Sequence, residues 1–262
     1  MTGRGHTIDT VHLDRLRFRS SLLLLAGVSV GSTAFIISMT VTALVAQRIT
    51  GDPAWTGVPV AATILGTACG TWLLSVSMSR WGRRRGLIAS YATAAVGGLI
   101  ACVATFIASF SLLITGVFVL GVGNSANALT RYVAADLQPP PRRATMIGWI
   151  VWSGTVGAVL GPNLLAPADE VGVSSGLPPL AGPYLASTLT FLGAAVLYLI
   201  MLKPDPGPLS FMSNDGETRP AATRTPVSRL FRTPRVRVAS VALVLGHVVM
   251  VLLMTMTDYR EH

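Results

Sequence analysis

The chain has 262 residues, of which 51% are hydrophobic and only 12% are charged, and its mean hydropathy is +0.61. Soluble domains carry about a quarter charged residues, so this composition excludes an ordinary soluble protein and indicates a chain embedded in a lipid bilayer. The net charge of +9 does not indicate nucleic-acid binding, because the arginines form short clusters between apolar segments and have no aromatic-rich basic face.

Seven apolar segments follow one another along the chain. Each is close to the roughly 20 residues that a helix needs to cross a hydrocarbon core about 30 Å thick. Backbone groups in lipid need internal partners, so we expect helices and an all-α integral membrane fold. The expected spans are Ser21–Ala46, Gly57–Met78, Leu87–Ser109, Leu112–Thr130, Met146–Ala166, Pro183–Leu202 and Val236–Thr257.

The segments between the spans divide the chain into parts. Residues 1–20 form an amino-terminal tail, and residues 21–202 hold six helices joined by short links. Residues 203–235 are rich in Pro, Ser, Thr and Arg, a composition that is typical of a linker and cannot bury a core. Residues 236–257 form the seventh helix, and residues 258–262 form a short tail. The sequence therefore predicts a six-helix bundle, a basic linker and one further transmembrane helix.

The positions of the cations predict the orientation. If the amino terminus lies in the cytoplasm, only Arg48 and Arg260 among the basic residues fall outside the cell, and Arg131 falls in the cytoplasmic loop after the fourth span. Cytoplasmic loops of membrane proteins are enriched in Lys and Arg. We therefore expect a multi-pass protein of the cell membrane, inner or plasma, with the tail 1–20 and the linker in the cytoplasm. Its expected surroundings are the lipid bilayer.

A basic loop follows the second span, in the sequence from Ser75 to Arg85. A glycine permits a tight turn there, and the cations can bind carboxylates and the carbonyl ends of helices. The loop resembles the signature of the major facilitator superfamily, G-x-x-x-D-R-x-G-R-R/K, with Ser75 and Ser79 in place of the first Gly and the Asp. A plain positive-inside loop is the alternative. The matching residues are Arg80, Gly82, Arg83, Arg84 and Arg85.

The fifth span contains a second motif, Gly154-Thr-Val-Gly157-Ala-Val-Leu-Gly161-Pro162. It resembles the antiporter motif of the same superfamily, which centres on G-x-x-x-G-P. Glycines four apart share one helix face and let a neighbouring helix approach, while Pro162 removes an N–H donor and can bend the helix. Ordinary packing of small residues is the alternative.

The loop after the fourth span runs from Asp136 to Arg143 and resembles the superfamily's loop between helices four and five. Pro141 occupies the position of the usual acidic residue, as Ser79 does in the earlier loop. We therefore expect Asp136 to be the remaining carboxylate near the basic cluster. The alternative is a solvated loop acid that contributes little free energy.

Polar residues within the spans are candidates for a transport pathway. Asn124 and Asn127 share one face of the fourth span, and they line a cavity or form hydrogen bonds between helices. His247 lies well inside the seventh span. It is either a gating residue that titrates or a neutral imidazole that forms a hydrogen bond with a neighbouring helix. Cys69 and Cys102 lie in apolar segments without metal-ligand spacing. We expect no metal, no cofactor and no enzymatic activity.

These motifs together resemble the small-molecule and drug antiporters of the superfamily. The resemblance implies two six-helix halves, an unknown small-molecule substrate bound between them, and alternating access by rocking. This chain would supply the amino-terminal half and helix seven, so we expect a truncated transporter that is inactive alone. A half-size transporter that dimerises and a non-transporting membrane interaction protein are the alternatives.

Overall fold

The computed structural model describes residues 4–202, residue 238, residues 241–242 and residues 245–246. The chain divides into two units, Met1–Asp215 and Gly216–His262, and the described residues 4–202 belong to the first. The expected linker 203–235 lies outside the described residues. So does nearly all of the expected seventh helix, including His247.

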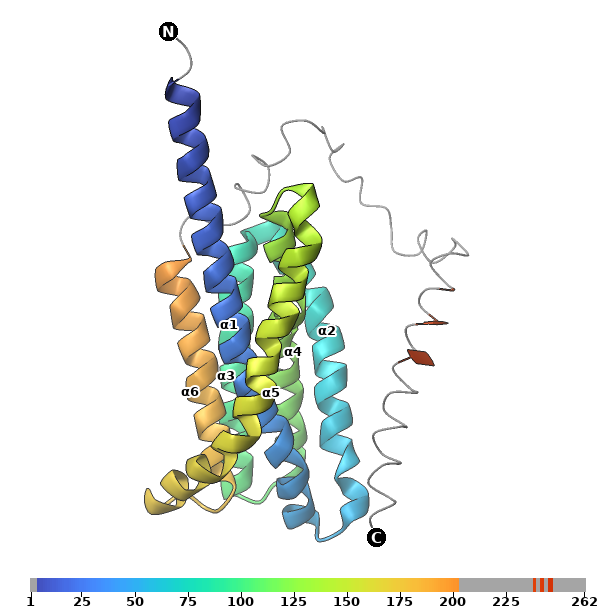
Figure 1. Ribbon diagram of the computed structural model, residues 1–262. Coiled ribbons are helices and arrows are strands. Elements are labelled where there is room, and N and C mark those ends of the chain that lie inside the picture. Colours follow the sequence, from blue (N-terminus) through green and yellow to red (C-terminus); the bar gives the residue numbers. More distant parts are fainter. Residues whose placement is uncertain (1–3, 203–237, 239–240, 243–244, 247–262) are drawn as a thin grey trace. The chain divides into compact units, whose positions relative to one another are not determined.

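Six long helices make up the described bundle, and each is long and apolar enough to cross a membrane (Figure 1). The first six expected spans are therefore confirmed as helices, and the all-α fold is confirmed. The helices are α1 (Arg4–Thr50), α2 (Gly57–Trp81), α3 (Arg83–Phe106), α4 (Phe110–Asp136), α5 (Arg143–Ser174) and α6 (Ala181–Met201), with short 3-10 turns η1 (Pro53–Trp55) and η2 (Pro140–Arg142).

Most of the helices extend beyond the expected spans, and α1 and α4 change the interpretation of charged segments. Helix α1 begins at Arg4 and therefore runs through most of the expected tail. Helix α4 continues to Asp136, so Arg131 lies inside the helix and not in the loop where the sequence placed it. Hydropathy ends a span at the first charged residue, whereas backbone hydrogen bonding continues until the chain turns.

Successive helices run in alternate directions in Figure 1, so the α2–α3 link, the α4–α5 link and the end of α6 lie at one end of the bundle. We call this the basic end. Its links and flanking turns carry a cluster of six cations, which are Arg80, Arg83, Arg84, Arg85, Arg142 and Arg143. At the opposite end, the described bundle carries Arg48, which donates a hydrogen bond to the carbonyl oxygen of Pro179.

The helices pack closely because small residues lie where they cross. A Cβ atom added at Gly66 or Gly70 of α2 would lie 2.1 or 2.2 Å from a backbone carbonyl oxygen of α4. These distances are far shorter than van der Waals contact, so the two backbones touch. On the other side of the bundle, α1 packs against α5 and α6, and α3 packs against α4 and α6. The largest fully buried side chains include Tyr91, Tyr184, Tyr198 and Phe191.

Helix α5 contains two prolines, Pro162 and Pro167. The later part of α5 bends away from the direction of its first part in Figure 1. Proline removes a backbone N–H donor and clashes with the carbonyl group four residues earlier, so it accounts for a bend at this place. The bend carries the end of α5 toward the start of α6, where the Asp169 side chain accepts a hydrogen bond from the backbone N–H of Leu180.

Candidate functional site

Gly82 alone links α2 to α3 at the basic end. Its φ of +89° lies in the region that L side chains rarely adopt, so a glycine is needed to reverse the chain between Trp81 and Arg83. The Ser79 hydroxyl, at the position of the family's Asp, donates a hydrogen bond to the carbonyl oxygen of Val76 on its own helix.

The cations of this loop take two different environments. The Arg83 guanidinium binds the Asp136 carboxylate at 2.7 Å, and Arg84 donates to the carbonyl oxygen of Leu199, 2.5 Å away, in the last turn of α6. Arg80 and Arg85 are exposed. The start of α3 is thus joined to the ends of α4 and α6, and a cation near a helix carboxyl terminus interacts favourably with the helix dipole. The ion pair with Arg83 places Asp136 beside the basic cluster.

The glycine motif of α5 faces α1, and its members differ in how closely they are packed. A Cβ atom at Gly157 would lie 2.6 Å from backbone atoms of Ser32 and Thr33, and one at Gly161 would lie 2.6 Å from the Ile36 side chain. A Cβ atom at Gly154 would meet only the Ser32 hydroxyl at 3.7 Å, which is ordinary contact. Within this motif, Gly157 is therefore the glycine that lies closest to the backbone of α1.

A polar network crosses the interior from α3 to α4. The Tyr91 hydroxyl donates to the Asn127 amide oxygen at 2.7 Å, and the Asn127 amide nitrogen donates to the Asn124 amide oxygen at 2.8 Å. Space for this network comes from Gly31 on α1, where a Cβ atom would lie 2.5 Å from the Asn127 oxygen. Hydrogen bonding inside an apolar bundle fixes the Asn127 side chain, because an unpaired amide there is costly.

A cavity of about 270 Å³ lies between α1, α4 and α5, and we call it the Arg131 cavity. Asn127 and Arg131 are four residues apart on one face of α4, and both line it. The full lining is Val28, Ser32, Asn127, Ala128, Arg131, Ile150, Val151 and Gly154. The cavity therefore combines an amide, a hydroxyl and a guanidinium with aliphatic walls.

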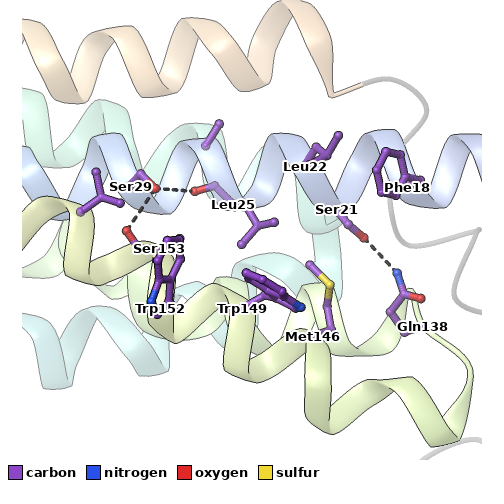
Figure 2. A pocket seen from close by; sticks show the side chains of 12 residues that line it. Phe18, Ser21, Leu22, Leu25, Ser29, Gln138, Met146, Trp149, Trp152 and Ser153 are labelled. Carbon is purple, nitrogen blue, oxygen red and sulfur yellow. Dashed lines mark hydrogen bonds between the residues drawn. The ribbon is translucent and has the colours of Figure 1, made fainter.

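A larger and mostly apolar cavity of about 590 Å³ lies between α1 and α5, nearer the basic end (Figure 2). We call it the tryptophan cavity because Trp149 and Trp152 form its α5 wall, with their ring centroids 6.0 Å apart in an edge-to-face arrangement. Figure 2 shows two hydrogen bonds that join its walls, from Gln138 to the Ser21 hydroxyl at 3.1 Å and from the Ser29 hydroxyl to the carbonyl oxygen of Ser153 at 3.1 Å. Both cavities are lined in part by residues of α1 and α5.

Arg131 and Tyr91 were not among the candidates chosen from the sequence. Arg131 was assigned to a loop, although its spacing of four from Asn127 and seven from Asn124 places all three on one helix face. Tyr91 gave no signal, since one tyrosine in an apolar helix is usual. Among the described residues, no group of His, Cys, Asp and Glu could hold a metal ion.

Comparison with known proteins gives the family. The sequence profile of the Major Facilitator Superfamily matches residues 23–262. Two relatives from Bacillus subtilis (strain 168), both named as uncharacterized MFS-type transporters, are YddS, 33% identical over 84% of this chain and 51% of its own, and YdeG, 32% identical over 88% and 55%. The riboflavin transporter RfnT of Brucella anthropi is 29% identical over 90% of this chain and 57% of its own.

The chain spans about half the length of these curated relatives. No solved structure matches it significantly. The profile match over nearly the whole chain, the identity to YddS and YdeG and the six apolar helices agree with one another, and they show that this chain belongs to the Major Facilitator Superfamily.

Proposed function

We propose that this chain forms the amino-terminal half of a transporter that moves a small molecule across the cell membrane by alternating access. The superfamily consists of transporters and not of enzymes. The Arg131 cavity is the main support for this proposal, because an amide, a hydroxyl and a guanidinium line a space between apolar helices. Polar groups at such positions are costly and mark the pathways of solutes and ions.

A second six-helix half would form the other wall of the pathway, and a longer polypeptide would supply it. Alternating access in this type of fold is a rocking of two halves around a site between them. The tryptophan cavity supports this arrangement, because Trp149 and Trp152 are exposed on α5 and form an apolar surface that another helix can cover.

The loop contacts at the basic end would act in the rocking movement. Arg83 and Arg84 join three helices there through one carboxylate and one helix carbonyl group, so breaking these contacts would free the ends of α4 and α6. The cations at this end support a cytoplasmic amino terminus. We propose that the Gly157 to Pro162 segment and His247 also take part in gating, in an exchange of substrate for an ion.

Transport by reconstituted protein tests this function. The chain alone, and a form extended through a second six-helix half, would be placed in liposomes with an imposed pH gradient. Riboflavin is the first probe, because one relative is named a riboflavin transporter, and lipophilic dyes follow. The extended form should move at least one compound in a gradient-dependent manner, and the chain alone should move none.

Asn127→Ala in the extended form is the matched variant, since it removes a polar group of the cavity, and it should slow transport. Robust transport by the chain alone would contradict the need for a second half. An extended form that is folded and moves no compound, with or without a gradient, would refute the transport function.

A further inference from the structure

Among the residues that the structure describes, the guanidinium in the Arg131 cavity has hydrogen-bond donors without a partner. Its Nε–H donates to the carbonyl oxygen of Ala128 at 2.7 Å, and its central carbon lies 5.7 Å from the centroid of the Tyr132 ring. Both contacts hold the guanidinium in place, and neither uses its two terminal NH₂ groups. Arginine presents five N–H donors in a planar fork that fits a carboxylate, so four remain for a ligand.

The positive charge of the cavity has no acidic partner in the described bundle. Arg131 is the one ionisable residue among those that line the cavity. Asp136, the nearest acid along α4, is bound to Arg83. The remaining carboxylates whose side chains the structure describes lie toward the opposite end of the bundle, and they are Asp52, Asp169 and Glu170. An anionic ligand would therefore find an unbalanced cation.

Arg131 lies near the end of α4, and its charge is only partly exposed to water. It lies five residues before the end of the helix, which is about 7.5 Å at 1.5 Å per residue. Its side chain is half-buried and lines the cavity, although long cationic side chains near helix ends usually extend toward water. Electrostatic attraction is stronger in such partly water-excluded surroundings than in bulk water.

We propose that the Arg131 cavity binds the carboxylate of a small organic monoanion, which is the transported molecule; this inference rests on the proposed function. Arg131 binds the carboxylate through its terminal NH₂ groups. Val28, Ile150 and Val151 contact the carbon skeleton. A single fixed cation matches one negative charge, so dianions and phosphate esters with two charges are disfavoured.

Asn127 contributes the polar contact beside the cation. Its amide oxygen accepts from Tyr91, and one of its two amide N–H groups donates to Asn124. The second N–H is available to the ligand, and the network holds the amide so that it presents a donor rather than an acceptor. Two donors on one helix face therefore favour an acceptor such as a carboxylate.

Binding of benzoate and benzamide to the full chain in mild detergent tests the proposal. The two probes have nearly the same shape and differ in charge, and equilibrium dialysis at low ionic strength gives both affinities. The wild-type chain should bind benzoate about tenfold or more tightly than benzamide, because hydrogen bonds to charged groups are about twice as strong as neutral ones. A chain that binds benzoate no better than benzamide, including one that binds neither, overturns the proposal.

Three variants test whether the preference for benzoate over benzamide depends on Arg131. Arg131→Gln should abolish it, and Arg131→Lys should keep part of it, because lysine retains the charge without the planar fork. Arg142→Gln makes the same change of charge at an exposed position of the basic end, and it should leave the preference unchanged. Circular dichroism checks folding, and the lysine variant decides the matter if the glutamine variant does not fold. A preference that survives the loss of Arg131, or that Arg142→Gln removes as fully, overturns the proposal.

Failure of this inference differs from failure of the proposed function. Binding is measured on the chain without any transport. If the chain prefers benzoate and the preference depends on Arg131, but the extended form transports nothing, the anion site is supported and the transport function is refuted. Transport of a compound by the extended form, without an Arg131-dependent preference for carboxylates, refutes the anion site alone.

Discussion

The close approach of α1 and α5 gives a sharp prediction about two glycines of the same motif. In Gly157→Ala the new Cβ atom would lie 2.6 Å from backbone atoms of Ser32 and Thr33, whereas ordinary contacts are 3.4–4 Å. The two helices would have to move apart by about 1 Å, and overpacking of this kind costs about 1–3 kcal/mol. Gly154→Ala adds the same atom 3.7 Å from the Ser32 hydroxyl, where no movement is needed.

The two variants should therefore differ in stability although their sequences change in the same way. Alanine favours a helix over glycine by up to about 1 kcal/mol, so Gly154→Ala should be neutral or slightly more stable than the wild type. The free energy of unfolding can be measured by titrating the detergent-solubilised chain with sodium dodecyl sulfate. Helix content by circular dichroism gives the unfolded fraction, and tryptophan fluorescence, to which Trp149 and Trp152 on α5 contribute among five tryptophans, gives a second signal. Equal midpoints for the two variants would refute the close backbone approach at Gly157.

Two further predictions use the same titration. Asp136→Asn and Arg83→Gln should show a coupling free energy of about 0.2–1 kcal/mol in a double-mutant cycle, because the pair is partly exposed to solvent, and strictly additive effects would show that the ion pair contributes nothing. Tyr91→Phe should destabilise the chain by about 1–2 kcal/mol, because it leaves the amide oxygen of Asn127 without its donor. Tyr132→Phe is the control, since that ring is exposed, and a midpoint for Tyr91→Phe equal to that of the control would contradict the network.

Much of the basic end could be predicted from the sequence. The single-glycine link at Gly82 and the clustered arginines follow from local composition. Ser79 and Pro141 occupy positions that are acidic in the family motifs, so Asp136 was the carboxylate expected near the arginines. The loop sequence could not determine which arginine binds this carboxylate. Arg83 is the partner because the start of α3 and the end of α4 meet at this depth, while Arg80 on α2 is exposed.

The cavities could not be predicted to the same extent. Asn124 and Asn127 were chosen because an amide in lipid needs a partner or a wet space, and the structure gives Asn127 both, a bond to Tyr91 and a place in the cavity wall. Arg131 was not predicted to line a cavity, because a hydropathy pattern ends an apolar segment at a charged residue. The helix continues past it, and its position in the cavity depends on where α1 and α5 cross α4.

The sequence by itself determined the six described spans, the membrane class, the family motifs and the concentration of cations at one end. These properties depend on the length and composition of each segment, and both can be read from that segment without its neighbours in space. Only the tertiary structure decided that Gly157 touches α1 while Gly154 does not, that Arg83 binds Asp136, and that Arg131 lines a cavity. The rotation and depth of each helix in the bundle fix these contacts, and packing against the neighbouring helices sets both.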